Sequence, residues 1–454
     1  MVTQEVELPL SPTALLTRCA AQPYVFALDG GSTASWGTGR ALLGFRPRAT
    51  LQVDADGSGR IICDGATRRC AGDPFVLLER FRAEWTPPAA GTAGWAGGVL
   101  AALGYDLCHW VERLPRRAAD DRGLPVLHVA AYDWVLSYAY ASRRYQLSSA
   151  SYSAAQLRQV AAELEALAAA PPPAAAHAGG CPVPDLTGAE YAARVQAVLR
   201  YIAAGDVYQV NLAQRFVVAP APAPVRLFAA LQHAHAMPFA AYVDGGDFVL
   251  VSNSPECFLM REGDRVATYP IKGTRRRAAE PRRDAELAGA LHRDPKERAE
   301  HVMIVDLERN DLGRVCRIGS VRVDALAQVH TFPSLHHMIS TVSGELRAGT
   351  PLVDLLRATF PGGSITGAPK IRAMEIIDEL EPVRRGFYTG ALGFVANGGD
   401  AVFNLAIRTA VASAGRFTYH AGGGIVADSI PTREYQETLL KAQPFFAALT
   451  VPTV

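Results

Sequence analysis

The sequence lacks an excess of charge of either sign. Its 45 Lys and Arg residues are balanced by 44 Asp and Glu residues, which gives a formal net charge of +1. Nucleic-acid binders and proteins that attach to anionic membrane surfaces normally carry a marked basic excess, so both classes are disfavoured. Charged residues make up 20% of the chain and hydrophobic residues 49%. That composition excludes a mostly disordered chain.

Cysteine is sparse, and long apolar runs are missing. Seven cysteines are scattered without a CxxC pair, which is typical of reduced thiols and disfavours a zinc site. The Ala-rich stretches are broken by Arg, Glu, Gln or Pro, so none resembles a membrane span. The first residues, MVTQEVELPLSPT, lack the basic start and apolar core of a secretory signal. We therefore expect a cytoplasmic protein.

The clearest break in composition is the segment 168–184, AAAPPPAAAHAGGCPVP. Three consecutive prolines end a helix, and the Ala and Gly residues around them have little to bury. At about 150 residues per domain, the length of the chain suits two or three domains. We predict an N-terminal region at 1–167, a linker at 168–184 and a C-terminal region at 185–454.

Local signals already place some elements. The N-terminal region alternates short apolar runs with turn signals, which is typical of a strand-rich sheet. Thr187 and Glu190 form a capping-box pattern that begins a helix, and Gly205 ends it. The next segment, DVYQVNLAQRF, alternates like a strand, with Gln209 and Asn211 on its polar side. That side could face solvent or line a cleft.

Two predicted helix starts each carry a pair of carboxylates three residues apart. Glu297 and Glu300 form the first pair, and Glu434 and Glu437 form the second, so each pair shares a helix face. The two pairs could converge on Mg²⁺, which binds through few carboxylates. Acidic residues in a first helical turn also simply complement the helix dipole. Glu437 with Lys441 is moreover an ordinary surface pair, so both interpretations stay open.

Other segments give weaker signals on their own. Lys272, between an apolar flank and a glycine in TYPIKGT, could be desolvated and nucleophilic, although most lysines are surface charges. The AGGGIV run could approach an anion closely, although a tight turn is the commoner use. The arginines at 275–277, 282 and 283 are expected in a solvated, mobile loop. His336 and His337 are expected in hydrogen-bonded core positions.

Taken in order, a series of motifs is much more specific than any one of them. Between Leu186 and Phe446 the chain contains GDVYQVNLAQRF, SNSPECF, YPIKGTR, DPKERAEHVMIVDLERNDLGR, HHMIS, FPGGSITGAPK, ELEPVRRGFYTGALGF, NLAIRTA and GGGIVADSIPTREYQETLLKA. Here it resembles the chorismate-utilising enzymes, which include anthranilate, aminodeoxychorismate, isochorismate and salicylate synthases. Residues 24–47 and 94–107 resemble them more loosely. The resemblance implies an α+β fold in which two large antiparallel β-sheets pack against each other with helices outside, and in which the two regions interleave.

Two positions distinguish the branches of this family. Lys272 in PIKGT resembles the aminodeoxychorismate synthase branch, since anthranilate synthases typically have Ala there. Gln209 stands where isochorismate and salicylate synthases carry a lysine that activates water, and an amide cannot act as that base. The resemblance therefore implies that chorismate and ammonia give 4-amino-4-deoxychorismate, for p-aminobenzoate and folate, with Lys272 as a covalent nucleophile.

The resemblance also implies roles for the carboxylates. Glu300 and Glu437 would hold Mg²⁺, which grips the ring carboxylate of chorismate, and Glu297 and Glu434 would orient that ion or its waters. Glu256, in SPECF, would be the general acid that protonates the departing C4 oxygen. That role requires a protonated carboxyl, so we expect burial or a neighbouring charge to raise the pKa of Glu256.

A further group of residues would bind the substrate. Arg408 and Tyr388 match positions that bind the enolpyruvyl carboxylate, and a planar guanidinium suits a two-point contact with it. Backbone N–H groups of a turn at the three-glycine run would assist. The remaining substrate contacts are expected from His337, Gly273, Thr274, Gln209, Gly422, Gly423 and Gly424.

Some features depart from the family pattern or lie outside it. Cys257 replaces the usual Arg of SPERF, and Glu308 stands where Val is common and is expected to be exposed. The stretch from Ala27 to Ser32 lacks the LLES element of the tryptophan feedback site, so feedback by tryptophan is not expected. No glutamine amidotransferase motif is visible, which implies that a separate amidotransferase subunit supplies the ammonia.

Two alternatives remain beside this interpretation. The first is an anthranilate synthase component I, against which Lys272 counts. The second is a catalytically inactive scaffold subunit of the same fold. The intact set of motif residues counts against an inactive copy, which has no reason to keep Glu256, Lys272, Glu300, Arg408 and Glu437 together.

Overall fold

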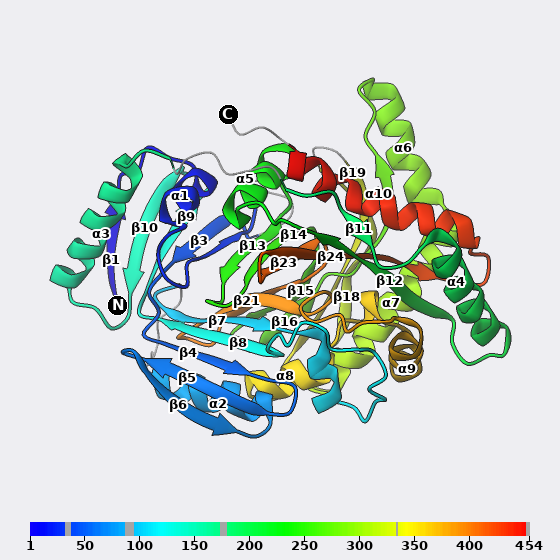
Figure 1. Cartoon of the computed structure of the whole chain (residues 1–454), viewed down its shortest axis with the longest axis horizontal. Coiled ribbons are helices and arrows are strands. Elements are labelled where there is room, and N and C mark those ends of the chain that lie inside the picture. Colours follow the sequence, from blue (N-terminus) through cyan, green and yellow to red (C-terminus); the bar gives the residue numbers. More distant parts are fainter. Residues whose placement is uncertain (32–37, 87–94, 173–178, 333–334, 451–454) are drawn as a thin grey trace.

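Two large antiparallel sheets form the centre of the molecule in the computed structural model of the chain (Figure 1). The structure describes residues 1–31, 38–86, 95–172, 179–332 and 335–450. Among these residues each sheet has 12 strands. The predicted α+β fold of two packed sheets with helices outside is confirmed. Within the described residues no helix combines the length and the apolar character needed to cross a bilayer.

The first sheet joins strands from both ends of the chain. Its order is β1 (Val2–Val6), β10 (Arg144–Ser149), β9 (Trp134–Ala139), β3 (Arg40–Gly44), β2 (Phe26–Asp29), β13 (Phe239–Asp244), β14 (Val249–Ser254), β23 (Thr409–Ser413), β24 (Arg416–Ile425), β12 (Gln209–Val218) and β11 (Val183–Pro184), with β20 (Gly367–Ala368) also paired to β12.

The second sheet is built in the same interleaved way. Its order is β17 (Ile271–Arg276), β19 (Leu335–Glu345), β16 (Arg265–Thr268), β15 (Cys257–Glu262), β22 (Ala401–Leu405), β21 (Ala391–Ala396), β7 (Gly98–Leu103), β8 (Leu127–Tyr132), β4 (Ala49–Val53), β5 (Ser58–Cys63) and β6 (Ala66–Ala71), with β18 (Arg322–Thr331) also paired to β19. Strands from both sides of the 168–184 break thus lie in both sheets, as expected.

The break itself is partly regular structure. Helix α3 (Ala154–Ala169) runs into its start, and β11 at its end pairs with β12. Residues 173–178 of the predicted linker, like Ser32, lie outside the described residues. The region boundaries at 167 and 185 stay predictions.

Helices cover the outer faces of the sheets (Figure 1). The first sheet is covered by α1 (Pro12–Cys19), α3, α5 (Pro224–His235) and α10 (Pro431–Thr450). The second is covered by α2 (Pro74–Trp85), α7 (Pro295–Gly313), α8 (Leu352–Thr359) and the turn η1 (Tyr105–Trp110). Near β12 lie α4 (Gly188–Ala203), α9 (Lys370–Leu380) and the turn η2 (Gly363–Ile365), while α6 (Pro281–Arg293) extends outward at the upper right.

The space between the sheets is filled by one apolar cluster. Phe26 of β2 and Val135 of β9 pack there with Ala130 of β8 and Phe394 of β21. Central strands are therefore covered on both faces, which explains why β7 (GVLAAL) is an unbroken apolar run rather than an alternating one. This packing fixes the strand ends that carry the site.

Side-chain caps set the starts of the helices nearest the site. The predicted capping box of α4 is present, with Thr187 and Glu190 bonded reciprocally. Asp294 caps α7 by accepting hydrogen bonds from the backbone N–H groups of Lys296 and Glu297. A cap of this kind contributes about 1 kcal/mol and fixes the direction in which the first-turn carboxylates point.

Candidate active site

Segments that are far apart in the sequence meet at one end of the two sheets. The side chain of Lys272, on β17, lies in the electrostatic field of Glu300 from α7 and of Glu437 and Lys441 from α10. Glu256, between β14 and β15, acts on the same amine. The structure therefore brings together the predicted nucleophile, the predicted general acid and both helices that carry the predicted metal ligands.

Lys272 is aimed by an irregularity in its strand. The pairing of β17 with β19 shifts register between Lys272 and Thr274, and Gly273 between them has φ of 74°. Residues with a Cβ adopt that left-handed conformation only with strain. Burial of the amine lowers the pKa of Lys272. Although the residue as a whole is only half-buried, this direction favours the neutral, nucleophilic form of the amine.

Glu256 is held in the interior by a single side-chain donor. Its side chain is almost fully buried, and the hydroxyl of Ser364 in η2 donates a 2.7 Å hydrogen bond to Oε1. Burial raises the pKa of Glu256 to about 7, against the opposing effects of the Ser364 hydrogen bond and the Lys272 charge. The carboxyl can therefore be protonated near neutral pH, as a general acid must be.

The four predicted metal ligands form two repelling pairs. Glu297 raises the pKa of Glu300, after the larger effect of burial, and Glu437 does the same to Glu434. The carboxylates are also approached by cations, since Nζ of Lys441 lies 2.7 Å from Glu437.

This arrangement suits a divalent cation in its charge, because a cation between the pairs would relieve both repulsions. In the described residues, however, no three His, Cys, Asp or Glu side chains stand close enough together to hold a metal ion as they are oriented here.

The three glycines do not form the predicted turn. Residues 422–424 lie within β24, where Gly424 pairs with Asn211 and Gly423 with Leu212 of β12. Neighbouring groups crowd the strand at all three positions, most severely at Gly422, where a Cβ would lie 2.4 Å from the backbone oxygen of Leu212. A Cβ on Gly423 would lie 3.3 Å from Oε1 of Glu437, and one on Gly424 would lie 2.9 Å from Cδ of Gln209. The expectation of a turn was wrong because these contacts come from residues distant in the sequence.

The polar side of β12 was predicted either to face solvent or to line a cleft, and the burial of Gln209 distinguishes the two. The side chain of Gln209 is fully buried, and neither Oε1 nor Nε2 has a hydrogen-bond partner among the residues that the structure describes. An amide left unpaired in the interior is costly, so a polar ligand beside it would be stabilised. The polar side of this strand therefore faces the interior rather than solvent.

The predicted substrate contacts lie around the same site. The hydroxyl of Thr274 is hydrogen-bonded to Nδ1 of His337 at 3.0 Å, while Nε2 of that ring has no partner within the described part of the chain. Burial lowers the pKa of His337 to about 3, so the ring is neutral. Arg408 acts electrostatically on His337 and on Tyr419. Tyr388 stacks on His420 with ring centroids 5.0 Å apart.

Two expectations about charged residues were wrong. Glu308 is buried rather than exposed, and its carboxylate accepts a hydrogen bond from Thr268. Of the arginines expected in a solvated loop, all but Arg275 are exposed, but Arg275 and Arg276 lie on β17 and Arg282 and Arg283 on α6, so only Arg277 lies in the loop between them. Arg275 lies on β17 and pairs with Asp294 and Glu297, and Arg277 pairs with Asp284.

Three site residues were missed from the sequence. The Glu437–Lys441 pair is present, but Lys441 also donates to the carbonyl of Gly422 at 2.9 Å and so belongs to the site. Ser364 and Arg385 were not singled out, although both lie inside the motifs FPGGSITGAPK and ELEPVRRGFYTGALGF. The hydroxyl next to a glycine pair was the available signal for Ser364.

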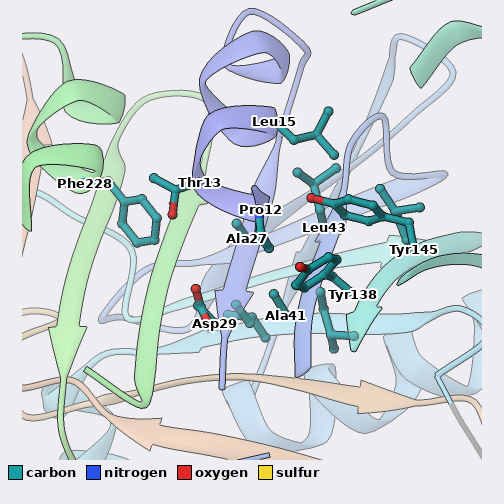
Figure 2. A pocket seen from close by; sticks show the side chains of 13 residues that line it. Pro12, Thr13, Leu15, Ala27, Asp29, Ala41, Leu43, Tyr138, Tyr145 and Phe228 are labelled. Carbon is teal, nitrogen blue, oxygen red and sulfur yellow. The ribbon is translucent and has the colours of Figure 1, made fainter. Parts of the chain in front are cut away.

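A separate apolar pocket lies away from this chemistry. Figure 2 shows it beneath α1, lined by Leu15, Leu43, Tyr138, Tyr145 and Phe228. Its main polar group is Asp29, which accepts hydrogen bonds from the hydroxyl of Tyr140. No predicted site residue lines it.

Comparison with known proteins agrees with this geometry. The family described as chorismate binding enzyme matches residues 25–447. Aminodeoxychorismate synthase component 1 of Klebsiella aerogenes is 40% identical, with 96% of each chain covered. Anthranilate synthase component 1 of Streptomyces coelicolor is also 40% identical, over 83% of this chain and 78% of the relative. The crystal structure of anthranilate synthase component I from Streptococcus pneumoniae superposes with a TM-score of 0.78 at 28% identity, covering 90% of this chain and 92% of that one. This chain is therefore a member of the chorismate-binding enzyme family.

Proposed function

We propose that this chain is the large subunit of an aminodeoxychorismate synthase. It would replace the C4 hydroxyl of chorismate by ammonia to give 4-amino-4-deoxychorismate, the precursor of p-aminobenzoate and folate. The observation that carries the proposal is the desolvated amine of Lys272, held at the Gly273 bulge between Glu256 and Glu300. The 40% identity to the Klebsiella aerogenes protein supports it.

The chemistry follows from the positions of the amine and the acid. Neutral Nζ of Lys272 would add at C2 of the ring, both ring double bonds would shift, and the C4–O bond would break. Glu256 would give its proton to the departing oxygen, which leaves as water, while the added amine loses one proton to solvent. Ammonia would then add at C4, both double bonds would shift back, and the lysine would leave C2 as a neutral amine with the proton that the added ammonia gives up. One difficult displacement is thereby divided into two easier ones.

The acidic helices supply the place for a metal. Glu300 and Glu437 would hold Mg²⁺, which when bound would neutralise and fix the C1 carboxylate of chorismate. Glu434 lies one helical turn before Glu437 and would act on the ion's waters. Glu297 is already engaged, because it pairs with Arg275 at 3.2 Å, and that contact supports an outer position for it.

The second carboxylate of chorismate requires a different recognition. Arg408 can offer a two-point contact, and Tyr388 a hydroxyl. On one edge of β24, the pairing with β23 ends at Tyr419. Residues 420–425 pair with β12 on the other edge, so their remaining backbone groups point away from β12. Neutral His337 and the amide of Gln209 would add hydrogen bonds without a second basic group, which supports binding of the substrate without activation of water.

Ammonia would come from a separate glutamine amidotransferase subunit. This follows from the proposed reaction, because the described site offers no group that hydrolyses glutamine. The partner would deliver ammonia to C4 after the lysine adduct has formed. With ammonium salt in place of the partner, the chain should still turn over.

Anthranilate synthase is the second candidate, because a relative with that name is equally identical. Product analysis separates the two. The purified chain is incubated with chorismate, Mg²⁺ and ammonium chloride, and the products are separated by chromatography with mass detection. We expect 4-amino-4-deoxychorismate. Anthranilate with pyruvate would overturn the assignment in favour of the second candidate, and no turnover would favour an inactive scaffold subunit.

A further inference from the structure

A fully buried arginine lies directly behind the site. Only 2% of Arg385 is exposed, and its guanidinium donates to both carboxylate oxygens of Glu381, at 2.9 Å and 2.6 Å. Glu381 in turn accepts a 2.9 Å hydrogen bond from the backbone N–H of Ala213 on β12. Burying such a pair costs desolvation energy that apolar residues of the same size would avoid. Its presence here calls for a role beyond stability.

The remaining hydrogen bonds of Arg385 reach three walls of the site. One N–H donates to the carbonyl of Asn211 on β12 at 2.7 Å, two residues after Gln209. Another donates to the carbonyl of Ile365 in η2 at 3.0 Å, and to the hydroxyl of Thr389 at 3.3 Å. The planar group also lies over the ring of Tyr388, 5.6 Å from its centroid. A single cation therefore ties together a strand, a turn and a substrate-binding tyrosine.

The contact with η2 has a chemical consequence. Ile365 directly follows Ser364, whose hydroxyl is the side-chain donor to Glu256. This hydrogen bond lowers the pKa of Glu256 and opposes the effect of burial. If η2 moved by even 1 Å, the hydrogen bond would weaken and the acid would titrate at a higher pH.

We propose that Arg385, braced by Glu381, is a positioning residue that holds η2 so that Ser364 stays bonded to the general acid Glu256. The inference deepens the proposed function, since it rests on Glu256 being the acid. It does not depend on whether the product is aminated at C4 or at C2. Arg385 touches no reacting atom and acts only through Ser364 and the neighbouring backbone.

The chain offers a matched control on the same strand. Arg215 of β12 is also nearly buried, and it makes a two-point pair with Asp121 at 2.8 Å and 2.7 Å. Its other carboxylate neighbour is Asp185, at 3.8 Å, and neither acid belongs to the site. Arg385→Lys and Arg215→Lys therefore remove comparable buried guanidinium groups, of which only one is bonded to η2.

The test compares the pH dependence of kcat in these variants, with chorismate, Mg²⁺ and ammonium chloride as substrates. We expect Arg385→Lys to lower kcat by roughly tenfold to a hundredfold, the scale of a 1 Å misplacement, with KM changed by less than about threefold. In the pH profile of kcat for Arg385→Lys, the fall at high pH, where Glu256 loses its proton, should move to higher pH. We call this fall the basic limb. Arg215→Lys should keep the wild-type kcat and the wild-type limb.

A double variant distinguishes positioning from general damage. Ser364→Ala should move the basic limb upward by itself, and adding Arg385→Lys should move it no further, because both changes act through one hydrogen bond. If the shifts add, or if Arg385→Lys matches Arg215→Lys in kcat and limb, the inference is overturned. If Arg385→Lys does not fold, Glu381→Gln is measured in its place. We then expect a smaller shift of the basic limb in the same direction, and an unchanged basic limb would contradict the inference.

Failure of the proposed function would give a different result from failure of the positioning role. Anthranilate as the wild-type product would overturn the proposed reaction and leave this test intact. A basic limb that Ser364→Ala does not move would overturn both the assignment of Glu256 and the positioning role that depends on it.

Discussion

The hydroxyl of Thr268, on β16, donates a 2.5 Å hydrogen bond to the carboxylate of Glu308, on α7. Both side chains are buried. Burial raises the pKa of Glu308 to about 8, and the charges of Glu256 and Asp311 act in the same direction. At neutral pH the folded protein therefore keeps a proton on a carboxyl that the unfolded chain releases.

This proton predicts how stability depends on pH. The ordinary glutamate pKa is 4.5, so between about pH 4.5 and pH 8 the folded state binds one more proton than the unfolded state. The contribution of Glu308 to stability therefore falls as pH rises through that window, by up to about 1.4 kcal/mol per pH unit. Glu308→Gln cannot ionise and should gain on the wild type as pH rises. Urea unfolding at pH 5.5 and pH 7.5 checks this, and an equal difference at both values would contradict it.

The acidic helices predict a strict metal requirement. Excess EDTA should abolish turnover, and added Mg²⁺ should restore it. Glu300→Gln should lose at least about a hundredfold in activity, because it removes a charge that acts on the reacting groups. Its melting temperature should stay near that of the wild type, because Glu300 lies in the second turn of α7, where the interaction of a glutamate with the helix dipole is worth less than about 1 kcal/mol.

Glu286→Gln is the control for this metal prediction. Its side chain is 51% exposed on α6 and pairs with Arg283, so activity and EDTA sensitivity should not change. Full activity of the wild type in excess EDTA would refute the metal assignment.

The unpaired amide of Gln209 predicts a change in nucleophile. A lysine at this buried position would be desolvated, and burial would lower its pKa and favour the neutral base. Gln209→Lys should therefore let water attack the ring, with a trace of isochorismate beside the normal product. Mass-resolved chromatography detects it. If no hydroxylated product forms in an otherwise active variant, this position alone does not select the nucleophile.

The sequence predicted well wherever a few neighbouring residues decide the structure. The capping box of Thr187 and Glu190 formed as expected, because it requires only four consecutive residues. The turn expected at residues 422–424 did not form, since the crowding that requires glycine there comes from α10 and β12. Glu308 was placed on the surface for the same reason, because its partner Thr268 is distant in the sequence.

The candidate site followed the same rule. Motif positions identified the carboxylates and Lys272, yet the electrostatics of that lysine depend on α7 and α10 meeting at β17. Lys441 was interpreted only as the i,i+4 partner of Glu437, because its second contact, with the carbonyl of Gly422, is not local. Contacts between charged residues on different helices and strands could not be predicted from the sequence pattern.

The central claim is that Lys272 is a covalent nucleophile rather than a charge that holds a carboxylate. The nearby carboxylates have other cations, since Glu437 pairs with Lys441 at 2.7 Å and Glu300 lies 4.0 Å from Lys296. Burial lowers the pKa of Lys272, which favours an amine ready to attack.

The most direct test withholds ammonia. The chain is mixed with chorismate and Mg²⁺, quenched, and measured by intact and peptide mass. The covalent mechanism predicts that the peptide containing Lys272 gains the mass of chorismate less one water, and that Lys272→Arg gains nothing. An unmodified peptide, from a preparation that turns over once ammonium chloride is added, would contradict the mechanism.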